Sequence, residues 1–232
     1  MLFRSDIDGD GDTDFIVGNM GENTKLKVSP ENPAFLDVND FDKNGTVEQI
    51  ISCLTEDGKT YPMVLKGELQ RALPMIKKNF IKYTDYANKS ITELFSAEQM
   101  KDCIQKKITT TKTSFLINDG KGNFEIKALP IEAQFSRIAA IETGDFNKDG
   151  ILDILLAGNF FDVLPEWGRF DANYGLFMQG KGKGIFQTIK SKDSGFRTIG
   201  QVRKMCKVKS ANQEMIVLAK NNDKAQVFSF KK

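Results

Sequence analysis

The stretch GDFNKDGILDILLAGN, residues 144–159, joins an acidic loop directly to a continuous apolar run. Its first half spaces oxygen side chains as a calcium loop does. Its second half, Leu152–Ala157, is typical of a β-strand that is covered on both faces. The stretch therefore predicts a strand in the interior of a mainly β fold, entered through an acidic turn.

Two other loops repeat the spacing of residues 145–153, namely 6–14 and 40–48. Each has oxygen side chains at positions 1, 3, 5 and 9 and glycine at position 6, which permits a sharp turn. Calcium prefers several hard oxygen ligands, and position 7 can add its backbone carbonyl. The sequence therefore predicts up to three Ca²⁺ sites. The predicted ligands are Asp6, Asp8, Asp10, Asp12 and Asp14; Asp40, Asp42, Asn44, Thr46 and Glu48; and Asp145, Asn147, Asp149, Ile151 and Asp153.

These loops do not have the pattern of an EF-hand. An EF-hand places a bidentate glutamate at position 12, where the three loops have Val17, Ile51 and Leu156. Their last acidic residue comes at position 9, directly before an apolar β run. Two alternatives stay open: metal-free Asp/Gly turns, and magnesium, which prefers fewer protein ligands.

The chain also repeats itself. GKGNF at 120–124 recurs as GKGIF at 182–186, and LDILLAGN at 152–159 recurs as EMIVLAKN at 214–221, both at an offset of 62 residues. DFIVGN at 14–19 is a third relative of the same strand. We expect four short strands in the clearest repeat, at 137–143, 152–157, 174–179 and 185–189. Repeated four-stranded antiparallel sheets predict β-propeller blades, with a sandwich as the alternative.

We expect one partial propeller domain over residues 1–232, a fragment of a longer chain. Its units are expected at about 6–29, 33–130, 133–190 and 197–230. A helical insertion is expected around 63–106, where apolar residues recur near a 3.6-residue period, Pro74 interrupts the helix, and SITE and SAEQ resemble capping boxes. The insertion is expected to pack against the propeller edge or to offer a docking surface.

The last unit has the strand without the acidic loop. A shift of 62 residues from the third loop leads to Lys207, Lys209, Ala211 and Met215, a set that cannot bind a cation. Calcium is therefore expected to brace a turn rather than to act as a sensor.

Composition excludes several classes of function. The formal net charge is +2, which suggests neither nucleic acid nor a membrane surface as a partner, and no apolar run is long enough to span a membrane. The chain has no histidine, which excludes Ser-His-Asp triads and histidine-ligated metal sites.

The acidic loops, the strands DFIVGN and DILLAGN, and the NDGKGNF hairpin resemble FG-GAP/VCBS repeats, the calcium-loop blades of integrin α-like propellers. NDFDKNGTVEQI, YPMVLKGELQRALP and GRFDANYG are similar to the C-terminal part of large bacterial VCBS-repeat surface proteins, some of which carry an ASPIC/UnbV segment that is not evident here. The resemblance covers nearly the whole chain. It implies an extracellular or cell-surface location and the calcium ligands named above.

The resemblance implies a non-catalytic module for binding a glycan or protein, or for scaffolding, with the rest of the parent chain as a further partner. The best local ligand site is the stretch 164–175, with Trp167, Arg169, Asp171 and Tyr174, although this loop could also pack on itself. Two alternatives remain: a polysaccharide-processing propeller enzyme, for which no pair of free carboxylates is evident, and a purely structural C-terminal domain.

Overall fold

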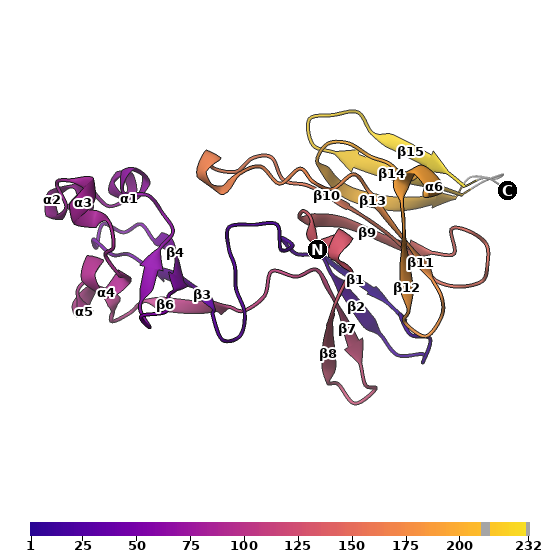
Figure 1. The fold of residues 1–232 in the computed structure, drawn as a ribbon, viewed down its shortest axis with the longest axis horizontal. Coiled ribbons are helices and arrows are strands. Elements are labelled where there is room, and N and C mark those ends of the chain that lie inside the picture. The colour runs from indigo at the N-terminus through magenta and orange to yellow at the C-terminus, as the bar shows by residue number, and fades with distance from the viewer. Residues whose placement is uncertain (210–213, 231–232) are drawn as a thin grey trace. The chain divides into compact units, whose positions relative to one another are not determined.

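The computed structural model describes residues 1–209 and 214–230. Within them the fold is mainly β, with four antiparallel sheets of three or four strands and a few short helices (Figure 1). The chain divides into two compact units: a main unit, Met1–Lys25 with Thr111–Lys232, and an inserted unit, Leu26–Thr110. No helix of the described residues is long and apolar enough to cross a membrane.

The first sheet of the main unit contains β1 (Leu2–Ser5), β2 (Asp14–Val17), β7 (Ser114–Asn118) and β8 (Phe124–Ala128), in that order. The tiling expected from the sequence groups residues 114–128 with residues 33–62, but in the structure β7 pairs with β2 instead. This pairing is achieved because the inserted unit leaves the sheet and returns at neighbouring points: the Gly21 N–H donates to the Thr111 carbonyl at 2.8 Å.

The second sheet agrees with the strands expected from the sequence. It consists of β9 (Ile138–Gly144), β10 (Asp153–Gly158), β11 (Leu176–Gly180) and β12 (Phe186–Ile189), in chain order. Every residue of β10 is buried, which confirms that this apolar run is a strand covered on both faces.

The third sheet has three strands in the described residues, β13 (Val202–Lys209), β14 (Glu214–Lys220) and β15 (Gln226–Ser229). Lys209 of β13 pairs with Glu214 of β14. Ala211, one of the positions that the 62-residue shift reaches, lies outside the described residues.

The three sheets of the main unit pack face to face in chain order. Ile154 and Leu156 of β10 join Ile16 of the first sheet in one core cluster. Their neighbour Leu155 points the other way and joins Met205 and Ile216 of the third sheet in a second cluster. Alternation along β10 thus supplies one core on each side of the second sheet.

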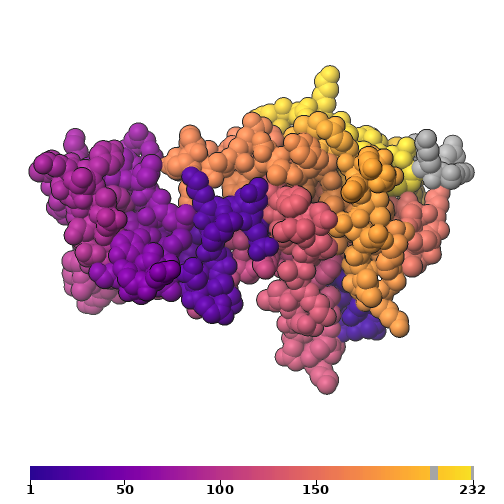
Figure 2. Space-filling view, in the orientation of Figure 1, coloured from indigo at the N-terminus to yellow at the C-terminus, as the bar shows by residue number. Residues whose placement is uncertain are grey.

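Short elements connect these sheets: η1 (Ile131–Gln134) lies between the first and second sheets, and α6 (Ser191–Ser194) between the second and third. A third short element, η2 (Pro165–Trp167), lies between β10 and β11 of the second sheet. The β7–β8 hairpin stands out from the neighbouring sheet of the main unit (Figure 2), in agreement with the exposure of all five β8 residues.

The inserted unit has its own sheet and core. Its strands are β3 (Ala34–Asn39), β4 (Glu48–Leu54), β5 (Thr60–Pro62) and β6 (Ile104–Ile108), in the order β5-β4-β3-β6. Strand β6 pairs along β3, so β3, the first strand of this sheet in the chain, lies in the sheet interior. In the first two sheets of the main unit the corresponding strands, β1 and β9, lie at the edge. The core includes Phe41 and Phe95, whose rings stack at 4.3 Å between centroids.

The helices of the inserted unit largely follow the sequence prediction. They are α1 (Lys66–Ala72), α2 (Pro74–Asn79), α3 (Tyr83–Tyr86), α4 (Ile91–Leu94) and α5 (Ala97–Met100). Pro74 begins a new helix, as expected, and the capping boxes at Ser90 and Ser96 are both present. The predicted helical range of 63–106 is too long, because residues 104–106 belong to β6, where pairing with β3 decides the structure.

We expect Leu155→Ala and Leu156→Ala each to lower the free energy of unfolding by about 2–5 kcal/mol, because each leaves a cavity in a filled core. The measurement is urea denaturation. Ile126→Ala is the control: this residue is 65% exposed, so its loss should change stability by no more than about 0.5 kcal/mol. A large loss from only one of the two leucines would contradict burial of both faces.

We expect residues 26–110 to be replaceable by a short Gly/Ser linker, because the strands they contain pair only with one another in the described residues and their ends leave and rejoin the main unit together. The shortened protein should keep the dispersed NMR spectrum of the main unit and a cooperative melt. Collapse of that spectrum would show that the main unit needs the insertion to fold.

Candidate metal-binding loops

The three acidic loops occupy the same place in their sheets. Residues 6–14 connect β1 to β2, residues 40–48 connect β3 to β4, and residues 145–153 connect β9 to β10. In each case the position-9 acid is the first residue of the second strand. The three loops therefore share a structural position as well as a sequence spacing.

The turn of each loop is built by the same hydrogen bonds. The glycine N–H at position 6 donates to the carboxylate at position 1, and the N–H at position 7 donates to the side-chain oxygen at position 5. The first set of bonds is Gly11 to Asp6 at 3.2 Å, Gly45 to Asp40 at 2.8 Å and Gly150 to Asp145 at 2.9 Å. The second set is Asp12 to Asp10 at 3.0 Å, Thr46 to Asn44 at 2.8 Å and Ile151 to Asp149 at 2.9 Å.

Glycine is required at position 6 by the backbone itself. Gly150 has a φ of 83°, and the corresponding glycines of the other two loops have φ values of 93° and 90°. Nothing lies within 4 Å of a Cβ built on Gly150, so the left-handed backbone rather than crowding excludes other residues.

The position-9 acid anchors each loop to the core. It accepts a hydrogen bond from the N–H at position 2, whose side chain is buried. These bonds are Ile7 to Asp14 at 2.8 Å, Phe41 to Glu48 at 3.2 Å and Phe146 to Asp153 at 3.0 Å. The buried position-2 side chains explain why one apolar residue interrupts each run of acids.

In the main unit the same acid also reaches the third strand of its sheet. The Asn118 N–H donates to Asp14 at 2.8 Å, and the Gly180 N–H donates to Asp153 at 2.9 Å. The sequence reasoning missed Asn118 and Gly180. They are separated by the same 62 residues as the repeats, and that offset was the signal that could have found them.

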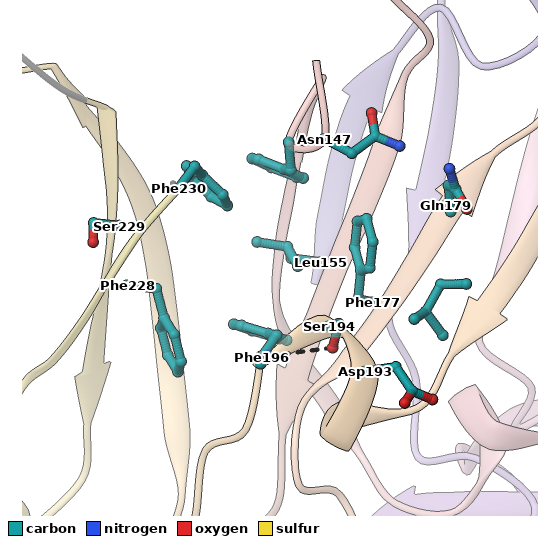
Figure 3. A pocket seen from close by; sticks show the side chains of 13 residues that line it. Asn147, Leu155, Phe177, Gln179, Asp193, Ser194, Phe196, Phe228, Ser229 and Phe230 are labelled. Carbon is teal, nitrogen blue, oxygen red and sulfur yellow. Dashed lines mark hydrogen bonds between the residues drawn. The ribbon is translucent and has the colours of Figure 1, made fainter. Parts of the chain in front are cut away.

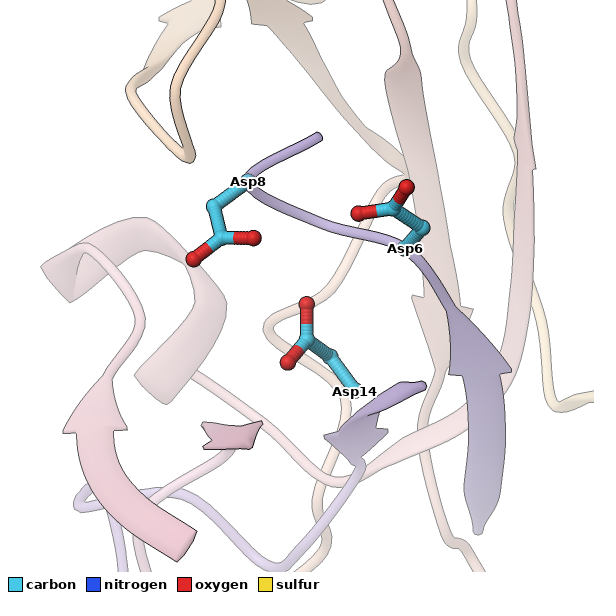
Figure 4. Close-up of side chains that lie close together, drawn as sticks. All are labelled: Asp6, Asp8 and Asp14. Atoms are coloured by element: carbon cyan, nitrogen blue, oxygen red, sulfur yellow. The ribbon is translucent and has the colours of Figure 1, made fainter. Parts of the chain in front are cut away.

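Two of the loops gather three carboxylates. Oxygen atoms of Asp6, Asp8 and Asp14 all lie within 4.8 Å of one another, and Figure 4 shows these carboxylates turned toward a common point. Asp40, Asp42 and Glu48 form the corresponding group in the inserted unit. Hard oxygen ligands at this spacing fit calcium, because they can converge on one ion.

One carboxylate oxygen in each of these groups has no partner among the described residues. The Oδ1 atoms of Asp8 and Asp42, both at position 3, are buried without a hydrogen bond, and so is Oδ1 of Asp12. A buried unpaired oxygen is unfavourable, and a bound cation would satisfy it. An unpaired buried oxygen at position 3 of two loops is the observation that best fits a bound metal ion.

Protonation is also affected in these loops. Burial, followed by the charges of Asp10 and Asp14, raises the pKa of Asp8 above its ordinary value. Burial likewise raises the pKa of Glu48, and the charges of Asp42 and Asp40 add to this effect. A cation at either site would reverse these shifts, since an opposite charge favours the ionised carboxylate.

The third loop is arranged differently. Its position 3 is Asn147, whose amide donates to Asp149 at 2.8 Å. The Ile151 N–H and, to a smaller extent, this bond lower the pKa of Asp149, while burial raises the pKa of Asp153. The side chain at position 3 of this loop is thus a donor to a neighbouring acid, whereas Asp8 and Asp42 at the same position each have an unpaired oxygen.

The aromatic loop at 164–175 packs partly on itself. The guanidinium of Arg169 lies 3.7 Å from the centroid of the Phe161 ring and 3.9 Å from the Asp171 carboxylate. Trp167 is half-buried, and Tyr174 is 50% exposed beneath the guanidinium of Arg197. Arg169 and Asp171 both stay more than half exposed, so these contacts lie at the surface.

Comparison of the chain with protein-family models, curated proteins and solved structures found no match.

We expect the effect of Asp8→Asn on the melting temperature to have opposite signs in chelator and in calcium. In chelator the variant should melt higher than the wild type, on the order of 2 °C, because it removes a negative charge from among other acids. In calcium it should melt lower, because a ligand is lost. Asp102→Asn, an exposed acid outside the loops, is the control and should change neither melt.

The advantage of Asp8→Asn in chelator should also depend on pH. Since the folded-state pKa of Asp8 is raised, the wild type loses stability as pH rises through that value. Below the ordinary value of 3.8 the carboxyl is protonated in both states, and the two proteins should then melt alike. A pH-independent difference would contradict the electrostatic cause.

Proposed function

We propose that the chain is a calcium-stabilised, extracellular β-propeller module of the FG-GAP/VCBS kind, which binds a glycan or protein or serves as a scaffold and has no catalytic role. The observation that carries the proposal is the buried, unpaired oxygen at position 3 of two loops, within groups of three converging carboxylates. Bare acids at this spacing repel one another, and a divalent cation removes the repulsion.

The identity of the cation follows from the ligands. All candidates are oxygen atoms from carboxylates, amides, hydroxyls or backbone carbonyls, which suit calcium or magnesium. Calcium accepts more protein ligands and a flexible geometry, whereas magnesium usually keeps several waters. Calcium is thus favoured, and the millimolar calcium outside cells matches the affinities typical of extracellular modules.

The stacking of sheets supports the propeller part of the proposal. Ile154 and Leu156 face the first sheet, and the residues 62 positions later, Ile216 and Leu218, face the second. The same face of each repeat thus packs against the preceding sheet, as blades of a propeller do. The exposed apolar residues Ile126 and Val227, on the first and third sheets, agree with a partial propeller whose end sheets pack against further sheets.

The role proposed for calcium is structural. The third sheet pairs Lys209 directly with Glu214 and stacks on the second sheet without any acidic loop. A sheet of this kind therefore forms without the ion, and calcium braces those turns in which acids have gathered. The aromatic loop at 164–175 is a surface for a glycan or protein ligand, and its exposed arginine already contacts Phe161 and Asp171.

The test is thermal unfolding of the whole chain in chelator, calcium and magnesium. We expect calcium to raise the melting temperature and chelator to lower it, because a ligand of the folded state stabilises by about 2.7 kcal/mol per site at a hundredfold excess over its Kd. The double variant Asp8→Asn/Asp42→Asn should lose most of this response. Identical melts in calcium and chelator would overturn the calcium assignment.

A further inference from the structure

An aromatic pocket lies between the second and third sheets of the main unit. Its volume is about 510 Å³, within the range of small-molecule sites. In Figure 3 Leu155 and Phe177 of the second sheet lie on one side, and Phe228 of the third sheet and Phe230, which follows that sheet's last strand, lie on the other. The turn carrying Phe196 closes one end. The pocket is thus formed by segments from three parts of the chain.

Phenylalanine dominates the lining. The five rings come from Phe146, Phe177, Phe196, Phe228 and Phe230. Several contact one another: Phe146 stacks on Phe230 with centroids 4.9 Å apart, and Phe196 packs against Phe228 at 4.9 Å. These mutual contacts fix the rings, so the pocket is largely preformed.

The charge of the lining has one sign. Among the thirteen lining residues Asp193 is the one charged side chain. Its carboxylate is exposed and has no hydrogen bond or ion pair with the described residues, and Figure 3 places it at the end of the pocket near Ser194. The amides of Asn147 and Gln179, by contrast, already bond within the third acidic loop and to Lys181.

The aromatic faces add to this charge preference. Ring faces carry partial negative charge and attract cations, and clusters of aromatic rings are a known means of binding quaternary ammonium groups. The ammonium of Lys207, which does not line the pocket, lies 5.6 Å from the centroid of Phe146. Phe146 therefore already has a cation beside it, and we expect the charge of a ligand to lie nearer the other rings of the lining.

We propose that this pocket binds a small organic cation with an apolar body, such as an alkyl- or arylammonium compound. The apolar body contacts Phe177 and Phe228, and the charged nitrogen lies toward Asp193. The carboxylate of Asp193 disfavours an anionic ligand, and the five rings disfavour a strongly polar one. The proposal goes beyond the calcium module and does not rest on calcium binding.

The test uses the whole chain and benzyltrimethylammonium as the probe, followed by NMR chemical shifts. We expect saturable shifts that are centred on the lining residues. The uncharged carbon analogue, 2,2-dimethylpropylbenzene, should bind at least about threefold more weakly, because it lacks the charge. Asp193→Asn should weaken binding of the cation about threefold and leave binding of the neutral analogue unchanged.

Phe177→Leu keeps most of the apolar volume and removes a ring face, so it should weaken binding of the cation more than binding of the neutral analogue. The controls are Asp102→Asn and Phe124→Leu, an exposed acid and an exposed phenylalanine outside the pocket, which should not change affinity. Absence of shifts at millimolar probe, equal affinity for the two probes, or unchanged cation affinity in Asp193→Asn would overturn the proposal.

Discussion

The buried carboxylate of Asp153 joins the acidic loop, β10 and β11 of the second sheet. Asp153 is fully buried, and its two oxygens accept N–H groups from Phe146, in the loop before the strand, and from Gly180, at the end of the third strand. One side chain thereby fixes the loop, the entry into β10 and the register of β11. The strand that follows is buried along its length and supplies the cores on both sides.

The same constraint recurs in the first sheet, where Asp14 accepts from Ile7 and Asn118. These bonds of Asp14 form although the inserted unit separates the second and third strands in sequence, because β7 still pairs with β2. In the inserted sheet Glu48 anchors its loop, but β6 pairs along β3, and helices fill the core. One loop design thus serves sheets of two different strand orders.

Much of the second sheet was predictable, because its signals are local. The apolar run before Gly158 predicts a strand, and the glycine-rich stretch at 180–185 predicts a hairpin turn. The first sheet was only partly predictable. Its strands lie about a hundred residues apart, and no local pattern states that residues 114–118 return to residues 14–17. Periodicity near residue 100 likewise could not show that helix gives way to strand β6, which depends on pairing with β3.

In the candidate site, the loop positions, the glycine turn and the acids were predictable from the sequence, since they follow from spacing and backbone freedom. Which acids converge depends on the folded structure. It leaves Asp8 and Asp42 with unpaired buried oxygens, while Asn147 and Asp149 satisfy one another in the third loop. It also decided that five phenylalanines from separate segments share one pocket. The reason is physical: spacing fixes local geometry, whereas burial and distance between remote segments arise only when the sheets pack.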